Sequence, residues 1–173
     1  MTTTTIKNTN LATLMKTVEL IDRLSQQATD AIMGLVRTAQ GALKSDDAAG
    51  TGTAMDAIIG LARDSAAEIK AQATVVGCQD TAYAFCVTSN APTKVRELQT
   101  AANLMDLYIQ EAARKIAGVA EVTKAAAGSG QLELLRPHLD STLLTIHDMA
   151  STVQDLVNGT AEDVGSNYRR DAA

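Results

Sequence analysis

Apolar side chains recur in this chain at steps of alternately three and four residues, from Leu11 to Leu43 and again from Val95 to Ala126. This spacing puts them on one face of an α-helix, and a seven-residue rhythm is typical of helices that pack side by side. The first stripe consists of Leu14, Val18, Ile21, Ser25, Ala28, Ile32, Leu35, Ala39 and Ala42. The pattern predicts two long helices that each bury one face.

The second stripe supplies the candidate interaction surface. It contains Val95, Leu98, Ala102, Met105, Ile109, Ala112, Ile116, Val119, Thr123 and Ala126. Long amphipathic helices without catalytic groups act by presenting surface to another helix, another chain or an apolar body. The residues that we predict to make this contact are the large ones of the stripe: Val95, Leu98, Met105, Ile109, Ile116 and Val119.

Breaks in the periodicity separate four predicted helices. The first runs from about Asn10 to Lys44, and a turn is predicted over 45–52 because helix breakers are concentrated there. The second begins near Thr53, where Thr53 and Asp56 have the spacing of a capping box.

The end of the second helix is open to two interpretations. Gly77 either ends it or is tolerated inside it, in which case the helix continues to about Val87. The third helix is predicted from about Thr93 to Ala127, after an asparagine and a proline within 89–92 that suit a helix start.

The fourth helix follows a glycine-rich break at 128–130 and carries apolar positions from Leu139 to Val164. Residues 132–136 form either a short turn or the frayed start of this helix. Because proline fits a helix interior poorly, we expect a kink at Pro137 or a helix start beside it.

Composition favours one all-α domain over residues 10–164, built as a bundle or coiled-coil-like array of four long antiparallel helices. The 173 residues suit a single domain, aromatic residues make up only 2% of them, and alanine, the best helix former, is abundant. We expect a thin, elongated core, a flexible arm at 1–9 and a loose tail at 165–173.

The two halves of the chain, 10–80 and 93–168, resemble each other. A shift of 84 residues superposes the first helix on the third, and a shift of 88 superposes the second on the fourth. Matched pairs include Asp22 with Asp106, Gln26 with Gln110, Ile32 with Ile116, Ile58 with Ile146 and Ile69 with Val157. Either a duplicated helical hairpin or chance similarity of alanine-rich helices explains this. We expect a longer second loop to absorb the difference of four.

Charge and hydropathy narrow the function classes. The net charge is −5 and no cluster of lysine and arginine marks a phosphate-binding surface, which argues against nucleic acid as a binding partner. No apolar run approaches the roughly 20 residues of a membrane span, and no export signal is recognisable, so we expect a cytoplasmic protein without a transmembrane segment. Cys78 and Cys86 are interpreted as small buried thiols.

Candidate catalytic and metal-binding residues are few. His138 and His147 are nine residues apart, which is not the spacing of a helical metal pair. Asp22 and Asp106 are a possible carboxylate pair, but we interpret them as residues of two solvated helix faces. We therefore expect a protein that is not an enzyme and holds neither metal nor cofactor.

The segment 82–99, continuing into 108–116, resembles phasins, the helical proteins that coat polyhydroxyalkanoate granules in bacteria. The matching motifs are Glu97-Leu98-Gln99, which opens a long alanine-rich helix, and Gln110-Glu111-Ala112 within it. The chain differs from phasins in lacking early phenylalanines and a tail rich in lysine and alanine. The resemblance implies a noncatalytic, oligomeric coat protein whose apolar faces lie on a polymer surface.

Two functional hypotheses follow. In the first, the helices coat a granule or another apolar surface and the chain forms a homo-oligomer, which adds the apolar burial that alanine-rich helices lack. In the second, four helices satisfy one another in a self-contained bundle that serves as a protein-interaction module.

Overall fold

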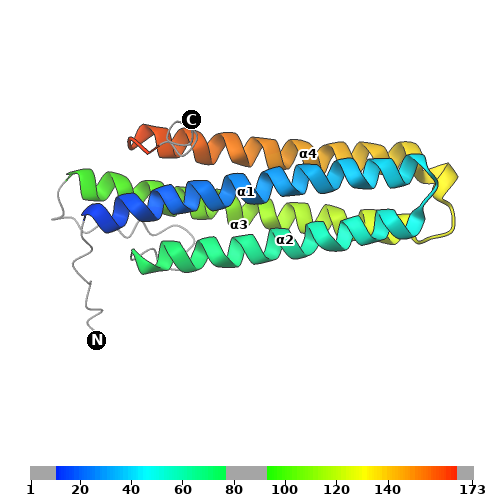
Figure 1. Cartoon of the computed structure of the whole chain (residues 1–173), viewed down its shortest axis with the longest axis horizontal. Coiled ribbons are helices and arrows are strands. Elements are labelled where there is room, and N and C mark those ends of the chain that lie inside the picture. Colours follow the sequence, from blue (N-terminus) through cyan, green and yellow to red (C-terminus); the bar gives the residue numbers. More distant parts are fainter. Residues whose placement is uncertain (1–10, 77–92, 167–173) are drawn as a thin grey trace.

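Four long helices form the computed structural model of this chain, which describes residues 11–76 and 93–166. They are α1 (Leu11–Lys44), α2 (Ala48–Val75), α3 (Thr93–Ala127) and α4 (Leu132–Asp163), and no strand occurs among the described residues. The helices lie antiparallel along the long axis of the molecule, with both short connections at the same end (Figure 1). Each helix packs against the next in chain order, and α4 closes the bundle against α1. The predicted all-α bundle is confirmed.

A single hydrophobic core runs the length of the bundle and receives side chains from all four helices. Its largest fully buried side chains are Leu14, Val18, Ile21, Leu43, Met55, Ile58, Ile69, Leu98, Met105, Ile116, Leu143 and Ile146. Both predicted stripes therefore lie inside one chain, each facing the other three helices.

The sequence similarity of the two halves extends to burial in three dimensions. A shift of 84 residues relates buried positions of α1 and α3, such as Leu14 with Leu98, Ile21 with Met105 and Ile32 with Ile116. A shift of 88 relates those of α2 and α4, such as Met55 with Leu143, Ile58 with Ile146 and Ala73 with Ala161. This correspondence is what a duplicated hairpin predicts.

We expected a longer second loop to contain the difference of four residues between these shifts, but it does not. The connections 45–47 and 128–131 are both short, and α4 instead has an extra first turn over 132–135. The helix continues through Pro137, so the alternative in which it starts beside the proline is wrong. Pro137 is the sixth residue of α4, where its nitrogen cannot donate the helical hydrogen bond to the carbonyl oxygen of Glu133, so the helix includes the proline at the cost of one backbone hydrogen bond.

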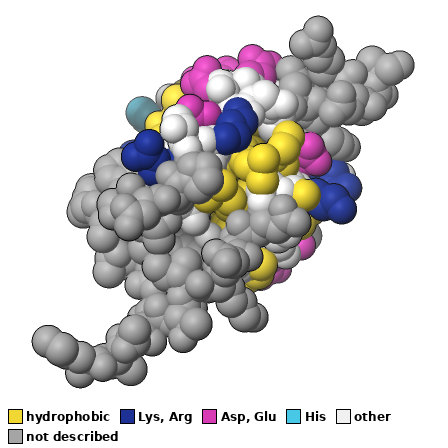
Figure 2. Space-filling view, turned by 90° about the vertical axis from the view of Figure 1, so that its left-hand side faces the viewer, with side chains coloured by type: hydrophobic (Ala, Val, Ile, Leu, Met, Phe, Trp, Pro, Cys, Tyr) yellow, Lys and Arg dark blue, Asp and Glu magenta, His cyan; other side chains and the backbone are white. Residues whose placement is uncertain are grey.

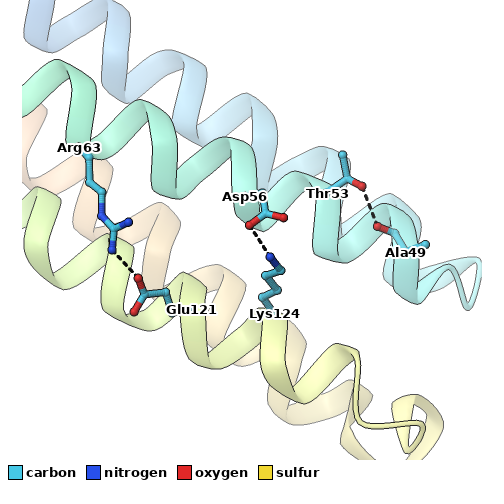
Figure 3. A network of polar contacts seen from close by, with 6 residues as sticks. All are labelled: Ala49, Thr53, Asp56, Arg63, Glu121 and Lys124. Carbon is cyan, nitrogen blue, oxygen red and sulfur yellow. Dashed lines mark hydrogen bonds and ion pairs between the residues drawn. The ribbon is translucent and has the colours of Figure 1, made fainter.

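The second helix begins earlier than predicted, at Ala48 rather than near Thr53, because Asp47 is its N-cap. Asp47 Oδ1 accepts a hydrogen bond of 2.8 Å from the backbone N–H of Gly50. A Cβ at Gly50 would lie 2.2 Å from Asp47 Oδ2, so glycine leaves room for the capping carboxylate. Thr53 is inside the helix, where its hydroxyl donates to the carbonyl oxygen of Ala49 (Figure 3).

Asp47→Ala is expected to reduce the free energy of unfolding by about 1 kcal/mol, because the Gly50 N–H loses its side-chain acceptor. Asp47→Asn keeps an acceptor oxygen and is the matched control. Chemical denaturation of both variants measures the difference, and equal loss in the two would contradict the capping role.

The end of α4 is more ordered than the loose tail that we predicted from residue 165. Gly165 has a φ of 84°, and the N–H groups of Gly165 and Ser166 donate to the carbonyl oxygens of Glu162 and Ala161. This is a Schellman motif, which satisfies the last carbonyls of the helix.

Several predictions fall on segments that the structure does not describe. They concern the arm, Cys78, Cys86, the tail beyond Ser166 and the continuation of the second helix past Gly77; α2 itself ends at Val75, with Val76 as its C-cap. No helix within the described residues combines the length and apolar character that a membrane crossing requires.

Candidate functional site

The residues of the predicted interaction stripe lie in the interior of the bundle. Leu98, Met105, Ile109 and Ile116 are buried, and Val95 and Val119 are half-buried and pack against the core. Their partners are the other helices of the same chain. In this closed bundle the four buried residues are covered by the other helices, and Val95 and Val119 stay partly exposed.

Polar side chains bridge the two helical hairpins, the first formed by α1 and α2 and the second by α3 and α4, along the two seams where they meet. At the seam between α2 and α3, Arg63 pairs with Glu121, and Lys124 Nζ lies 2.6 Å from Asp56 Oδ1 (Figure 3). The bridges between α1 and α4 are Gln26 with Asn158, Asp30 with Gln154 and Gln40 with Asp140, and Asp46, in the connection after α1, pairs with Arg136 on α4. The ion pairs are exposed, so each adds little to the stability of the bundle.

Asp22 and Asp106 occupy equivalent positions in the two halves and make equivalent contacts. Gln26 Nε2 donates to Asp22 Oδ1 at 2.9 Å, and Gln110 Nε2 donates to Asp106 Oδ1 at 3.1 Å. Asp22 is fully buried, so our interpretation of it as part of a solvated face is wrong. Gln26 reaches α4, whereas Gln110 donates to the carbonyl oxygen of Ala66 on α2. The two glutamines therefore reach across different seams, Gln26 toward α4 and Gln110 toward α2.

The two histidines both lie on α4. His138 is exposed, and His147 Nδ1 lies 3.6 Å from Oδ1 of the exposed neighbour Asp148. Within residues 11–76 and 93–166, no three His, Cys, Asp or Glu side chains are grouped so that they could hold a metal ion.

A groove runs along the outer side of the seam between α3 and α4. Its central part has a volume of about 340 Å³ and is floored by Ala112, Met149 and Val153. Tyr108 joins this part to a second hollow of about 680 Å³, near the start of α3 and the end of α4. The two hollows therefore form one elongated open groove parallel to the helices.

The edges of the groove combine apolar and charged side chains. Leu156, which is 45% exposed, forms an apolar edge on the α4 side. On the α3 side, Lys115 and Glu111 form an ion pair of 2.7 Å. The hydrogen bond from Lys115 and its positive charge hold the pKa of Glu111 below its ordinary value. Acidic residues outnumber basic ones among the charged groups that line the two hollows: Glu97, Glu111, Asp148 and Asp163 against Arg96 and Lys115.

Sequence reasoning missed this groove because, apart from Ala112, its residues on α3 flank the stripe instead of forming it. Leu104 and Tyr108 each directly precede a stripe residue, Met105 and Ile109, and heptad analysis assigns them to the flank. Tyr108 offered one signal, since it is the one aromatic residue in the described part of the chain.

The opposite end of the molecule from the short connections also exposes apolar side chains. Figure 2 shows this end, where hydrophobic side chains lie between groups of charged ones. Leu11 and Val75 are exposed there, at the start of α1 and the end of α2.

Comparison with protein-family models, with curated proteins and with solved structures found no match to this chain.

Proposed function

We propose that this protein is a noncatalytic interaction module that binds an amphipathic helix of another protein in the groove between α3 and α4. The observation that carries this proposal is the contrast between two apolar regions: the long stripes are enclosed in the core, whereas the groove is open to solvent. A helix laid into a groove between two helices is a recurrent mode of peptide recognition.

The lining of the groove indicates the chemistry of the partner. An apolar floor formed by Ala112, Met149 and Val153 suits a stripe of leucine-like side chains. The excess of carboxylates around it favours lysine or arginine beside that stripe, because charge complementarity steers and orients a partner. The proposed partner is therefore a helix with one apolar face and basic flanks.

A synthetic helical peptide with a leucine stripe and lysine flanks is a defined probe for this site. We expect its titration into the isotope-labelled protein to shift the amide resonances of residues around Tyr108 and Leu156. Leu156→Asn is expected to weaken binding about tenfold, equivalent to about 1.4 kcal/mol. Leu144→Asn, on the same helix and 50% exposed but outside the groove, is the matched control and should bind like the wild type.

Three outcomes of this titration would contradict the proposal. They are resonance shifts located away from the groove, equal loss of affinity in the two variants, and the absence of binding. A version of the peptide with glutamate in place of lysine should bind more weakly, since it meets the carboxylates of the lining.

The phasin-like coat is a second candidate, favoured by the distribution of exposed apolar residues. Most of the large ones belong to α3 and α4: Leu107, Val122, Leu134, Leu144 and Leu156. In this proposal several copies of the chain in the cytoplasm place the second hairpin against a polymer surface, and the core stays closed. Co-sedimentation with polymer granules separates the candidates, because enrichment over a soluble control is expected of a coat and not of a helix-binding module.

A further inference from the structure

A small cavity of about 20 Å³ lies between the helices, and its wall includes side chains from all four of them. Most of the wall is aliphatic, with isoleucines at Ile32, Ile69, Ile109 and Ile116. Three side chains in it carry hydroxyl groups: Ser25, Thr29 and Ser65. The polar groups are concentrated on α1 and α2, so the cavity is apolar on one side and polar on the other.

Ser25 is the unusual member of this group. Its side chain is 2% exposed, and its Oγ has no hydrogen-bond partner in the protein. The equivalent position in the second half of the chain is Ile109, which lines the same cavity. A serine thus takes the place of a much larger side chain, which leaves both empty space and an unsatisfied hydroxyl.

The other two hydroxyls are placed to accept hydrogen bonds. Thr29 Oγ1 donates to the carbonyl oxygen of Ser25 at 2.9 Å, and Ser65 Oγ donates to that of Leu61 at 2.7 Å. Each has therefore committed its proton to the backbone of its own helix and keeps oxygen lone pairs for another donor.

We propose that this cavity binds one water molecule, which accepts a hydrogen bond from Ser25 Oγ and donates to Thr29 Oγ1 and Ser65 Oγ. The volume suffices for a single water, which needs about 10–15 Å³ of accessible space and two to four polar partners. The water gives the Ser25 hydroxyl a hydrogen-bond partner and links α1 to α2 near the middle of the bundle. A dry cavity would leave this buried hydroxyl without a partner. This site is independent of the groove and of its partner.

Nuclear Overhauser measurements between water and the intact protein test this proposal directly. We expect the signature of a long-lived water at the methyl groups of Ile69 and Ile116, which line the cavity. Ser25→Val should fill the space, abolish these cross-peaks and raise the melting temperature by about 2–4 °C. Thr38→Val is the control: it removes an exposed hydroxyl of α1 and should leave the cross-peaks unchanged.

Ser25→Ala provides a second test with less risk to packing, because it removes one polar partner without adding volume. Weaker cross-peaks are expected in this variant. Absence of a long-lived water in the wild type would overturn the proposal, as would cross-peaks that persist unchanged in both Ser25 variants.

Discussion

Ile109→Asp is expected to unfold the protein at room temperature. Ile109 is 6% exposed and lies among side chains of the other helices in the middle of the core. A carboxylate there has no cationic partner among the side chains that line the neighbouring cavity. The cost of burying it is on the order of 5 kcal/mol, comparable with the whole stability of a small domain, about 5–15 kcal/mol. Loss of the helical circular dichroism signal measures the effect.

Leu107→Asp is the matched control, two residues away on the same helix and 41% exposed. It should remain folded, with a change in the free energy of unfolding within about 0.5 kcal/mol. The pair also distinguishes a core stripe from a surface stripe. A folded Ile109→Asp protein that had lost only its ability to bind a partner would contradict the position of the stripe inside the bundle.

Leu143→Ala is expected to reduce the free energy of unfolding by about 3 kcal/mol, through lost apolar burial and a residual cavity. Leu143 is fully buried on α4, at the position equivalent to Met55 on α2. For a protein of this size the melting temperature should fall by about 6–12 °C.

The neighbouring residue provides the control for this truncation. Leu144 is 50% exposed, so Leu144→Ala should change the free energy of unfolding by no more than about 0.5 kcal/mol. Equal effects of the two substitutions in thermal denaturation would mean that α4 does not bury Leu143 and expose Leu144.

The helices with the strongest periodicity were the most predictable from the sequence. The bounds of α3 agree with the prediction, Thr93 to Ala127, and α1 ends at Lys44 as expected. In the first half of both helices the predicted stripe is the buried face. Toward the C-terminal ends burial shifts by one residue, from Leu35 to Val36 on α1 and from Val119 to Ala120 on α3, because a helix turns every 3.6 residues and not every 3.5. The same periodicity revealed the similarity of the halves, which burial later reproduces at pairs such as Ile32 and Ile116.

The start of α2 was not predictable from composition. Residues 45–52 contain several helix breakers, and Gly50 was interpreted as part of a turn. In the structure Gly50 belongs to the first turn of the helix and donates to the capping carboxylate of Asp47. A glycine and an aspartate three residues apart fit either a loop or a capped helix start, and only the local geometry distinguishes them.

The candidate site was predicted only in part. The sequence identified the apolar stripe of α3, but whether a stripe faces its own chain or a partner depends on tertiary packing. The burial of Asp22 has the same origin: its hydrogen bond from Gln26 lies within α1, but the approach of Asn158 to Gln26 depends on how α4 packs against α1. The groove depends on two helices at once, and the pattern of one helix does not reveal it.

The central claim is that one chain completes its own core, and the concentration dependence of thermal unfolding tests it most directly. If the four helices of a single chain bury both stripes, the unfolding midpoint should stay constant over an approximately hundredfold range of protein concentration. A midpoint that rises steadily with concentration would contradict the claim, because it would show that the stripes are buried between chains.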